Sequence, residues 1–384
     1  MRAWWRAWRP SIVAGVLAFV IFWCVTEAIA LVSAHTGGTP ASLLSMSGPF
    51  SVWSRWDSGW YLLIARSGYV NNSHLQTAPG FYQDASAFAP LYPLLIRAVT
   101  HILPVGEVGA ATVVTTVALL CGLVVAHRLA AIDMGERGAG AAVALLLVFP
   151  SAFFLHALYA ESLLLLWVAG ALLAARTRHW WLASALAGAA VLTKVYSIIL
   201  IVPLAVEYLE AHRWSLRRIR FDATAVVAGP VVAFGALALY MRVRLGDALR
   251  FLHAESLWER RPAPPWTAVA HSISMVTNSG LDVSQRVLAA FDTVSPFLLV
   301  AGAALAWAQR RRSYAALLLI AGVLFASSAT LQSTGRYALT IVPLFIVAAA
   351  WLRAHARTAV LLGSASAALG GYFLHNYAVG AFAG

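Results

Sequence analysis

Apolar segments separated by short polar turns run through almost the whole chain. After a first segment at 12–33, they lie at 108–127, 139–157, 160–175, 180–192, 195–211, 222–241, 285–308, 314–331, 337–352 and 358–376. Several are shorter than the roughly 20 residues that a straight membrane-crossing helix needs, so we expect tilted or broken helices. The pattern predicts an all-α polytopic membrane protein with about eleven transmembrane helices.

Two long polar stretches, at 34–107 and 242–284, interrupt this pattern, and we expect juxtamembrane helices in the first. Within the first, 88–103 is apolar but carries Pro90, Pro93 and Arg97. We interpret it as a helix that dips into the membrane without crossing it. The sequence has no repeat of solenoid period and no separate soluble part, so we expect 1–384 to form a single integral-membrane domain.

The arginines in the short turns support this topology. With a non-crossing 88–103, one set of arginines falls on the same side of the membrane as the amino terminus: Arg128, Arg137, Arg176, Arg178, Arg213, Arg217, Arg218, Arg220, Arg310, Arg311, Arg312, Arg353 and Arg357. A crossing 88–103 would reverse this bias, against the tendency of basic residues to stay in the cytoplasm. We therefore expect both long loops outside the cytoplasm and an uncleaved first helix with its amino terminus inside.

Composition agrees with a membrane protein, because 61% of the residues are hydrophobic and 11% are charged. The net charge of +12 does not indicate a nucleic-acid partner, since the arginines serve the topology. Cys24 and Cys121 both lie in apolar segments, which excludes a disulfide framework or a cysteine-based zinc site. The bias toward arginine and alanine is typical of a GC-rich bacterial genome, so we predict the bacterial plasma (inner) membrane.

One acid lies among aromatic residues at the start of the first long loop. On a helical projection, Asp57 shares a face with Trp53, Trp56 and Trp60, and this face would lie against the membrane or the protein. Placing a carboxylate there costs desolvation free energy, which favours a functional role for Asp57. The alternative is that Asp57 only caps a helix that starts at Ser58.

Several cations lie on the outer side, where this topology leaves few of them. Lys194 and Arg336 stand at the outer ends of apolar segments without an acid partner nearby in sequence, and Arg97 lies in the dipping helix. Others line the second loop: Arg242, Arg244, Arg250, Arg260 and Arg261. Cations at membrane depth are costly and often functional, although snorkelling to lipid or pairing with an acid would also explain them.

The motifs of several chemistries are missing from the sequence. There is no Asp-x-Asp pair, no His-x-x-x-His, no phosphate-binding glycine loop and no Gly-x-Ser-x-Gly elbow. We therefore expect no metal, no other cofactor and no ATP-driven work. One carboxylate, several outward cations and many tryptophans instead suit transfer of a group from a lipid phosphate, with the carboxylate as base and the cations on the phosphate.

Ordered motifs along most of the chain carry a family resemblance. They include Arg55-Trp56-Asp57 with Tyr61 and Gly68-Tyr69, then 87–97 (AFAPLYPLLIR), Tyr159-Ala160-Glu161, the Trp258…Arg260…Trp266 run and Arg336-Tyr337. Together they resemble the PIG-V-like family of GT-C mannosyltransferases. Ala89, Glu255 and the step 193–195 depart from the family pattern, which leaves the sugar and the acceptor open.

The resemblance implies the GT-C fold and an inverting transfer of mannose from a polyprenyl-phosphate-mannose donor to a lipid-linked or glycan acceptor on the extracytoplasmic face. It implies Asp57 as the catalytic base and, with the charge argument, Lys194, Arg336 and Arg97 as ligands of the donor phosphate. The expected substrate-binding residues are Trp56, Trp60, Tyr61, Tyr92, Glu161, Trp258, Arg260 and Trp266.

Three alternatives stay open at this point. The same fold could transfer another sugar, such as a pentose or glucose, from a polyprenyl phosphate. A lipid or sugar transporter would also contain membrane charges, but it should show internal repeats and helices broken at mid-membrane. A catalytically silent membrane scaffold would not need an ordered Asp57.

Overall fold

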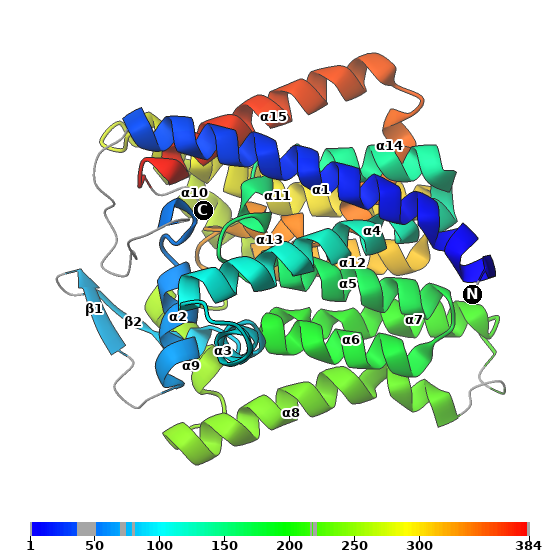
Figure 1. Cartoon of the computed structure of the whole chain (residues 1–384), viewed down its shortest axis with the longest axis horizontal. Coiled ribbons are helices and arrows are strands. Elements are labelled where there is room, and N and C mark those ends of the chain that lie inside the picture. Colours follow the sequence, from blue (N-terminus) through cyan, green and yellow to red (C-terminus); the bar gives the residue numbers. More distant parts are fainter. Residues whose placement is uncertain are drawn as a thin grey trace.

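The computed structural model describes residues 2–36, 51–69, 74–78, 81–215, 217 and 221–381. Its helices form a bundle in which most of the long members run in nearly the same direction (Figure 1). The long members are α1 (Arg2–Thr36), α4 (Glu107–Leu147), α5 (Glu161–Arg176), α6 (Trp180–Thr193), α8 (Ala225–Leu245), α11 (Val283–Ala308), α12 (Arg312–Ala326) and α15 (Ala356–Ala378). The prediction of a helical, multi-pass membrane protein is confirmed.

Four helical stretches of the described part are long and apolar enough to cross a membrane by length and composition. These are Trp5–His35, Glu107–Leu147, Phe221–Leu245 and Val283–Ala308. Other apolar helices are shorter, as the short segments predict, and include α3 (Leu91–Ile102), α6, α12 and α14 (Pro343–Leu352).

Breaks occur where the sequence predicts them. Gly135 has φ 70°, which a glycine adopts without strain, and it kinks α4 between the two predicted segments 108–127 and 139–157. After α6 a 3-10 turn, η4 (Val195–Leu200), precedes α7 (Ile201–Ala211). A further break, between α13 (Thr334–Leu339) and α14, lies inside the segment 337–352, which the sequence predicts as continuous.

Close packing of small residues joins α6 to α8. The backbone N–H of Gly229 donates to Ser184 Oγ at 2.7 Å, and a Cβ on Gly229 would lie 1.9 Å from the Ser184 carbonyl oxygen. Only glycine therefore fits at this crossing, as is typical of helix pairs in membrane proteins.

The short helices of the two long loops lie together at one end of the bundle. Figure 1 shows α2 (Ser58–Ser67), α3 and α9 (Arg250–Glu255) at this end, opposite the amino terminus, with α3 seen nearly end-on. The short elements η1 (Ser51–Trp53), η2 (Ala85–Ala87) and η7 (Ser256–Trp258), and the helix α10 (Pro265–Thr277), belong to the two loop regions, and η3 (Ala152–Leu155) connects α4 to α5. Because α3 lies across the direction of α5 and α6, it agrees with the non-crossing interpretation of 88–103.

A two-stranded hairpin departs from the all-α expectation. Strands β1 (His74–Ala78) and β2 (Phe81–Asp84) pair antiparallel, with His74 opposite Asp84. Most of the remaining predicted loop, 37–50, lies outside the described residues.

The arginine-rich turns are joined at the opposite end of the bundle. Asp133 accepts from Arg176 at 2.5 Å and from Arg311 at 3.2 Å, and Glu207 lies 3.4 Å from Arg176. These contacts join the kink region of α4 to the end of α5, to α7 and to the turn after α11. They place one group of the predicted cytoplasmic arginines at the same end as the amino terminus (Figure 1).

Candidate active site

A cavity of about 600 Å³ opens at the end of the bundle that carries α2 and α9. This volume is within the usual range for small-molecule sites. Its walls come from the start of α2, the α6–η4 turn, the α9–η7 region, the end of α12 and α13. Asp57, Lys194 and Arg336, which are far apart in sequence, all line it.

The carboxylate of Asp57 is bound by a guanidinium. Arg336 Nη1 donates to Asp57 Oδ2 at 2.8 Å. The Arg336 side chain is 3% exposed and that of Asp57 is 17% exposed, so the acid is the partner that keeps more access to the cavity.

A second acid lies behind this pair. Glu161, whose side chain is 1% exposed, accepts from Lys194 Nζ at 3.0 Å, and the same oxygen lies 3.4 Å from Arg336 Nε. The expectation that Lys194 and Arg336 lack acid partners is therefore wrong. The partners are distant in sequence, and only the packing of α2, α5 and α13 brings them together. Two acids and two cations form a compact cluster of no net charge.

Burial lowers the pKa of the Lys194 ammonium, and the neighbouring Glu161 carboxylate opposes this shift. Lys194 stands in the turn between α6 and η4, with an extended backbone at φ −148°. A lysine in such a position loses its proton at a lower pH than a lysine in water.

Asp57 is held by the backbone around it and not by capping. It occupies the position before α2, but its side chain makes no capping hydrogen bond, so the cap-only alternative does not describe its contacts. Trp56 has φ 52°, an uncommon conformation for a tryptophan. The Tyr159 hydroxyl donates to the Arg55 carbonyl at 3.0 Å and accepts from the Asp57 N–H at 3.2 Å. Such strain, fixed by neighbours, is frequent at functional sites.

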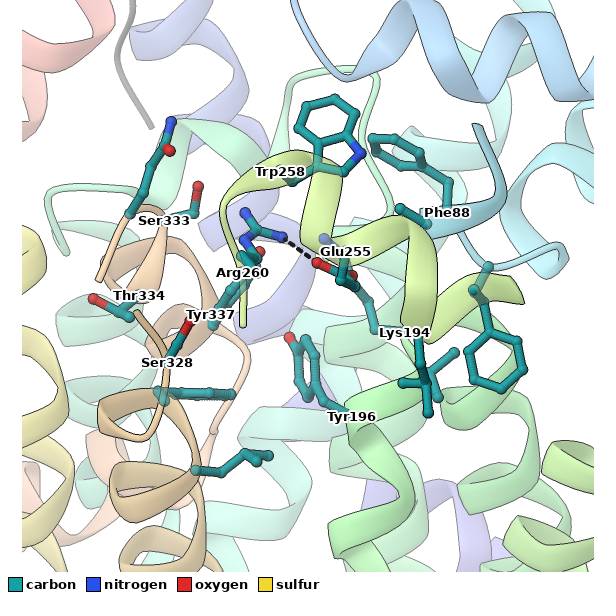
Figure 2. A pocket seen from close by; sticks show the side chains of 18 of the residues that line it. Phe88, Lys194, Tyr196, Glu255, Trp258, Arg260, Ser328, Ser333, Thr334 and Tyr337 are labelled. Carbon is teal, nitrogen blue, oxygen red and sulfur yellow. Dashed lines mark hydrogen bonds and ion pairs between the residues drawn. The ribbon is translucent and has the colours of Figure 1, made fainter. Parts of the chain in front are cut away.

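Aromatic rings form the wall next to Asp57. Phe88 and Trp258 line the cavity, with ring centroids 5.4 Å apart in an edge-to-face arrangement (Figure 2). Trp60 lies behind them, stacked on Phe88 at 6.1 Å. Tyr61 lines the cavity and is supported by Tyr92 at 5.1 Å.

The opposite wall combines charge and aromatic faces. Figure 2 shows Arg260 beside Glu255, with the Nη1–Oε2 contact at 3.3 Å. The Arg260 guanidinium also lies 5.1 Å from the centroid of Tyr337, and Lys194 Nζ lies 5.3 Å from the same ring. Such cation–π contacts orient cations without neutralising them.

The structure does not bring every predicted residue to this cavity. Arg97 is exposed on α3, where it donates to the Arg66 carbonyl at 3.3 Å. Trp266 is 74% exposed at the start of α10. Neither lines the cavity, because α3 and α10 present these side chains away from it. Trp56, Trp60, Tyr92 and Glu161 also do not line it. The last three contact residues that do, namely Phe88, Tyr61 and Lys194.

Sequence reasoning missed several lining residues, which include Phe88, Tyr196, Phe251, Ser328, Ser333, Thr334 and Tyr337. Tyr337 follows Arg336, and Phe88 lies in a quoted motif, so those two could have been found. The hydroxyl-bearing residues between α12 and α13 have no sequence signal, because their proximity to Asp57 arises only in the fold. Among the described residues, no group of three or more His, Cys, Asp or Glu is placed to hold a metal ion.

Comparisons with known proteins bear on the fold. No protein-family model and no curated protein sequence matches the chain. The chain is similar in structure to ArnT from Cupriavidus metallidurans bound to undecaprenyl phosphate, with a TM-score of 0.53 and 18% identity over 94% of this chain and 69% of that one. The apo state of the same protein gives a TM-score of 0.52 and 17% identity, over 94% and 68%. The oligosaccharyltransferase of Archaeoglobus fulgidus in the apo form gives 0.48 and 13%, over 96% and 56%.

The architecture and the similarity to ArnT define the chain as a membrane protein with the GT-C fold. The fold expected from the motif resemblance is thus confirmed. At this level of identity the similarity establishes the fold and not the reaction.

Proposed function

We propose that the protein is a glycosyltransferase that moves a sugar from a polyprenyl-phosphate donor to a hydroxyl of a lipid-linked or glycan acceptor. The observation that carries the proposal is that Asp57, Lys194 and Arg336 line one cavity at the loop-bearing end of the bundle. A potential base and two phosphate-binding cations thereby face the same space. By the charge bias of the turns, this end lies outside the cytoplasm.

Lys194 and Arg336 are proposed to bind the donor phosphate. A guanidinium carries five N–H donors, more than the contacts of Arg336 with Asp57 and Ser333 use. The phosphate would add negative charge to a cluster that is neutral without it. Arg260 and Arg261 also line the cavity and add positive charge beside the cluster.

Asp57 is proposed as the general base. It would accept the proton of the acceptor hydroxyl while that oxygen bonds to the anomeric carbon. The bond from this carbon to the phosphate oxygen breaks in the same displacement, and the polyprenyl phosphate leaves with the electron pair. One displacement inverts the configuration at the anomeric carbon. The two cations would stabilise the charge that grows on the phosphate.

The two kinds of wall suit the two parts of a lipid-linked sugar. Phe234, Phe251 and Phe325 contribute apolar surface for the polyprenyl chain. Trp258, Tyr337 and the hydroxyls of Ser328 and Thr334 offer faces and hydrogen bonds for a sugar ring. The structure of ArnT bound to undecaprenyl phosphate, which has the same fold, supports a polyprenyl lipid as the partner here.

Mannose is proposed as the sugar because of the PIG-V-like motifs, which would make the protein a mannosyltransferase. A pentose or glucose on the same lipid is the second candidate, since the departures at Ala89 and Glu255 fall in or beside the cavity lining. A transporter is disfavoured because Asp57, Lys194, Arg260 and Arg336 gather around one cavity at the loop-bearing end of the bundle.

A transfer assay tests the function. The purified protein, in lipid nanodiscs with membrane lipids as acceptors, would receive polyprenyl-phosphate mannose, glucose or pentose, each radiolabelled. We expect transfer from the mannose donor and an inverted linkage in the product. Transfer only from another donor would overturn the mannose assignment and leave the reaction class standing. No transfer from any of the three would contradict the proposed function.

A further inference from the structure

We infer that Asp292, an acid within helix α11, is a positioning residue that holds Arg336 in place for the donor phosphate. This inference rests on the proposed function for the role of Arg336, although the contacts of Asp292 do not. Asp292 is buried, does not line the cavity and belongs to none of the motifs that carry the family resemblance.

The carboxylate of Asp292 binds the turn that begins α13. Its Oδ2 accepts from the Ser333 N–H at 2.9 Å, and its Oδ1 accepts from the Gly335 N–H at 2.9 Å. The backbone carbonyl of Asp292 accepts from Thr334 Oγ1 at 2.5 Å. The first N–H groups of a helix have no partner within that helix, so this carboxylate supplies partners for two of them from another helix.

The chemistry of these contacts requires a carboxylate. Ser333 and Gly335 both present N–H donors, and each of the two carboxylate oxygens accepts one of them. An asparagine offers one acceptor, and its NH₂ would face the other N–H. A buried carboxylate is costly in an apolar helix, so a neutral residue would be expected here if the turn needed no such holder.

The held turn has an uncommon backbone. Ser333 has φ 68°, which costs free energy in a residue with a side chain. A Cβ on Gly335 would lie 2.1 Å from the Phe291 ring, so the turn packs directly on α11. The Gly335 carbonyl also accepts from Ser151 Oγ at 2.9 Å. Asp292 and Ser151 therefore hold the turn at both polar groups of the residue before Arg336.

The consequence for Arg336 is geometric. Its guanidinium lies 5.2 Å from the ring centroids of both Phe154 and Tyr159, and its Nη2 lies 3.4 Å from Ser333 Oγ. Because Asp292 fixes the backbone of Gly335, the Arg336 side chain extends toward Asp57 in one conformation. A shift of about 1 Å in such a group can reduce a reaction rate as much as 100-fold.

Hydrogen exchange tests the positioning without any assay of transfer. In the intact protein, the amides of the segment 333–336 should exchange slowly, and Asp292→Asn and Asp292→Ala should accelerate them in increasing order. Thr293→Ala is the matched control, because the neighbouring Thr293 Oγ1 donates only to Ala289 O of its own helix. Unchanged exchange in both Asp292 variants would overturn the inference, whether or not the protein transfers a sugar.

A double-mutant cycle tests the path through Arg336. We expect Asp292→Ala to raise the KM for the polyprenyl-phosphate donor about 10–100-fold in the wild-type background. In an Arg336→Ala background the same change should cost about twofold or less, since the residue through which it acts is gone. Equal, additive losses in both backgrounds would indicate a purely structural role and contradict the inference.

The two proposals fail in different ways. A protein that transfers no sugar, but whose 333–336 amides are released by Asp292→Asn, would refute the function and leave the positioning intact. A protein that transfers sugar with an unchanged donor KM in Asp292→Ala would refute the positioning alone. Thermal unfolding of each variant, measured in parallel, identifies any variant that has lost its fold.

Discussion

Asp57 and Arg336 are 279 residues apart in sequence, and their side chains form a 2.8 Å ion pair in the wall of a cavity. The pair connects the start of α2 with α13, and so the first long loop with the last third of the chain. Removing one partner of a buried pair leaves the other charge without compensation. This typically lowers the free energy of unfolding by about 3–5 kcal/mol. We therefore expect the pair to contribute to the stability of the fold as well as to the chemistry of the cavity.

The donor-binding role of the two cations predicts a loss of donor affinity. Lys194→Ala and Arg336→Ala should each raise the donor KM about 10-fold or more, because each removes a charged hydrogen bond to the phosphate. Arg244→Ala is the matched control, since Arg244 is exposed and does not line the cavity. A normal donor KM in both variants would contradict this role and would indicate that Arg260 and Arg261 bind the phosphate instead.

The lowered pKa of Lys194 predicts a pH dependence of donor binding. The ammonium binds phosphate only when protonated, so donor affinity should fall as the pH rises, and this fall should begin below the usual lysine pKa of about 10.4. Lys194→Arg should move the alkaline fall to higher pH, because a guanidinium keeps its proton there. Identical alkaline profiles of the wild type and Lys194→Arg would argue against Lys194 as the titrating group.

Much of the fold could be predicted from the sequence, because helix length and arginine position follow from the thickness and sidedness of a membrane. The kink at Gly135 and the short helix α3 in the first long loop are examples. The partners of Lys194 and Arg336 could not be predicted, since Glu161 and Asp57 reach them only through packing between distant helices. Arg97 and Trp266 were assigned from motif position, which does not say which way a side chain points.

Activity should not depend on a divalent metal. The reason is that a monophosphate leaving group can be neutralised by Lys194 and Arg336, which line the cavity together. Transfer measured with and without EDTA should agree within about twofold, a change too small to represent loss of a catalytic metal. A loss on chelation that Mn²⁺ restores would contradict this prediction and direct attention to Asp57 and Glu161.

The sidedness can be tested with single cysteines. Ser274 on α10 and Ala354 after α14 are both exposed, and the charge bias places them outside and inside the cytoplasm. In a background without Cys24 and Cys121, an impermeant thiol reagent on intact cells should label Ser274→Cys and not Ala354→Cys. Because Asp57 and Arg336 share one cavity, the reverse pattern would mean that the whole chain is inserted with its amino terminus outside, and the cavity would then face the cytoplasm.

The role of Asp57 as general base is tested most directly by measuring both sugar transfer and donor binding in Asp57→Asn. The asparagine keeps the shape of the side chain but cannot act as a base, so transfer should fall about 10²–10⁴-fold. Binding of polyprenyl phosphate, measured by the quenching of tryptophan fluorescence, should persist because Lys194 and Arg336 remain. Asp247→Asn, which changes a partly exposed acid outside the cavity lining, serves as the control and should keep full activity. A transfer rate of Asp57→Asn within about threefold of the wild type would contradict the role of Asp57 as general base, since loss of a general base lowers the rate by much more.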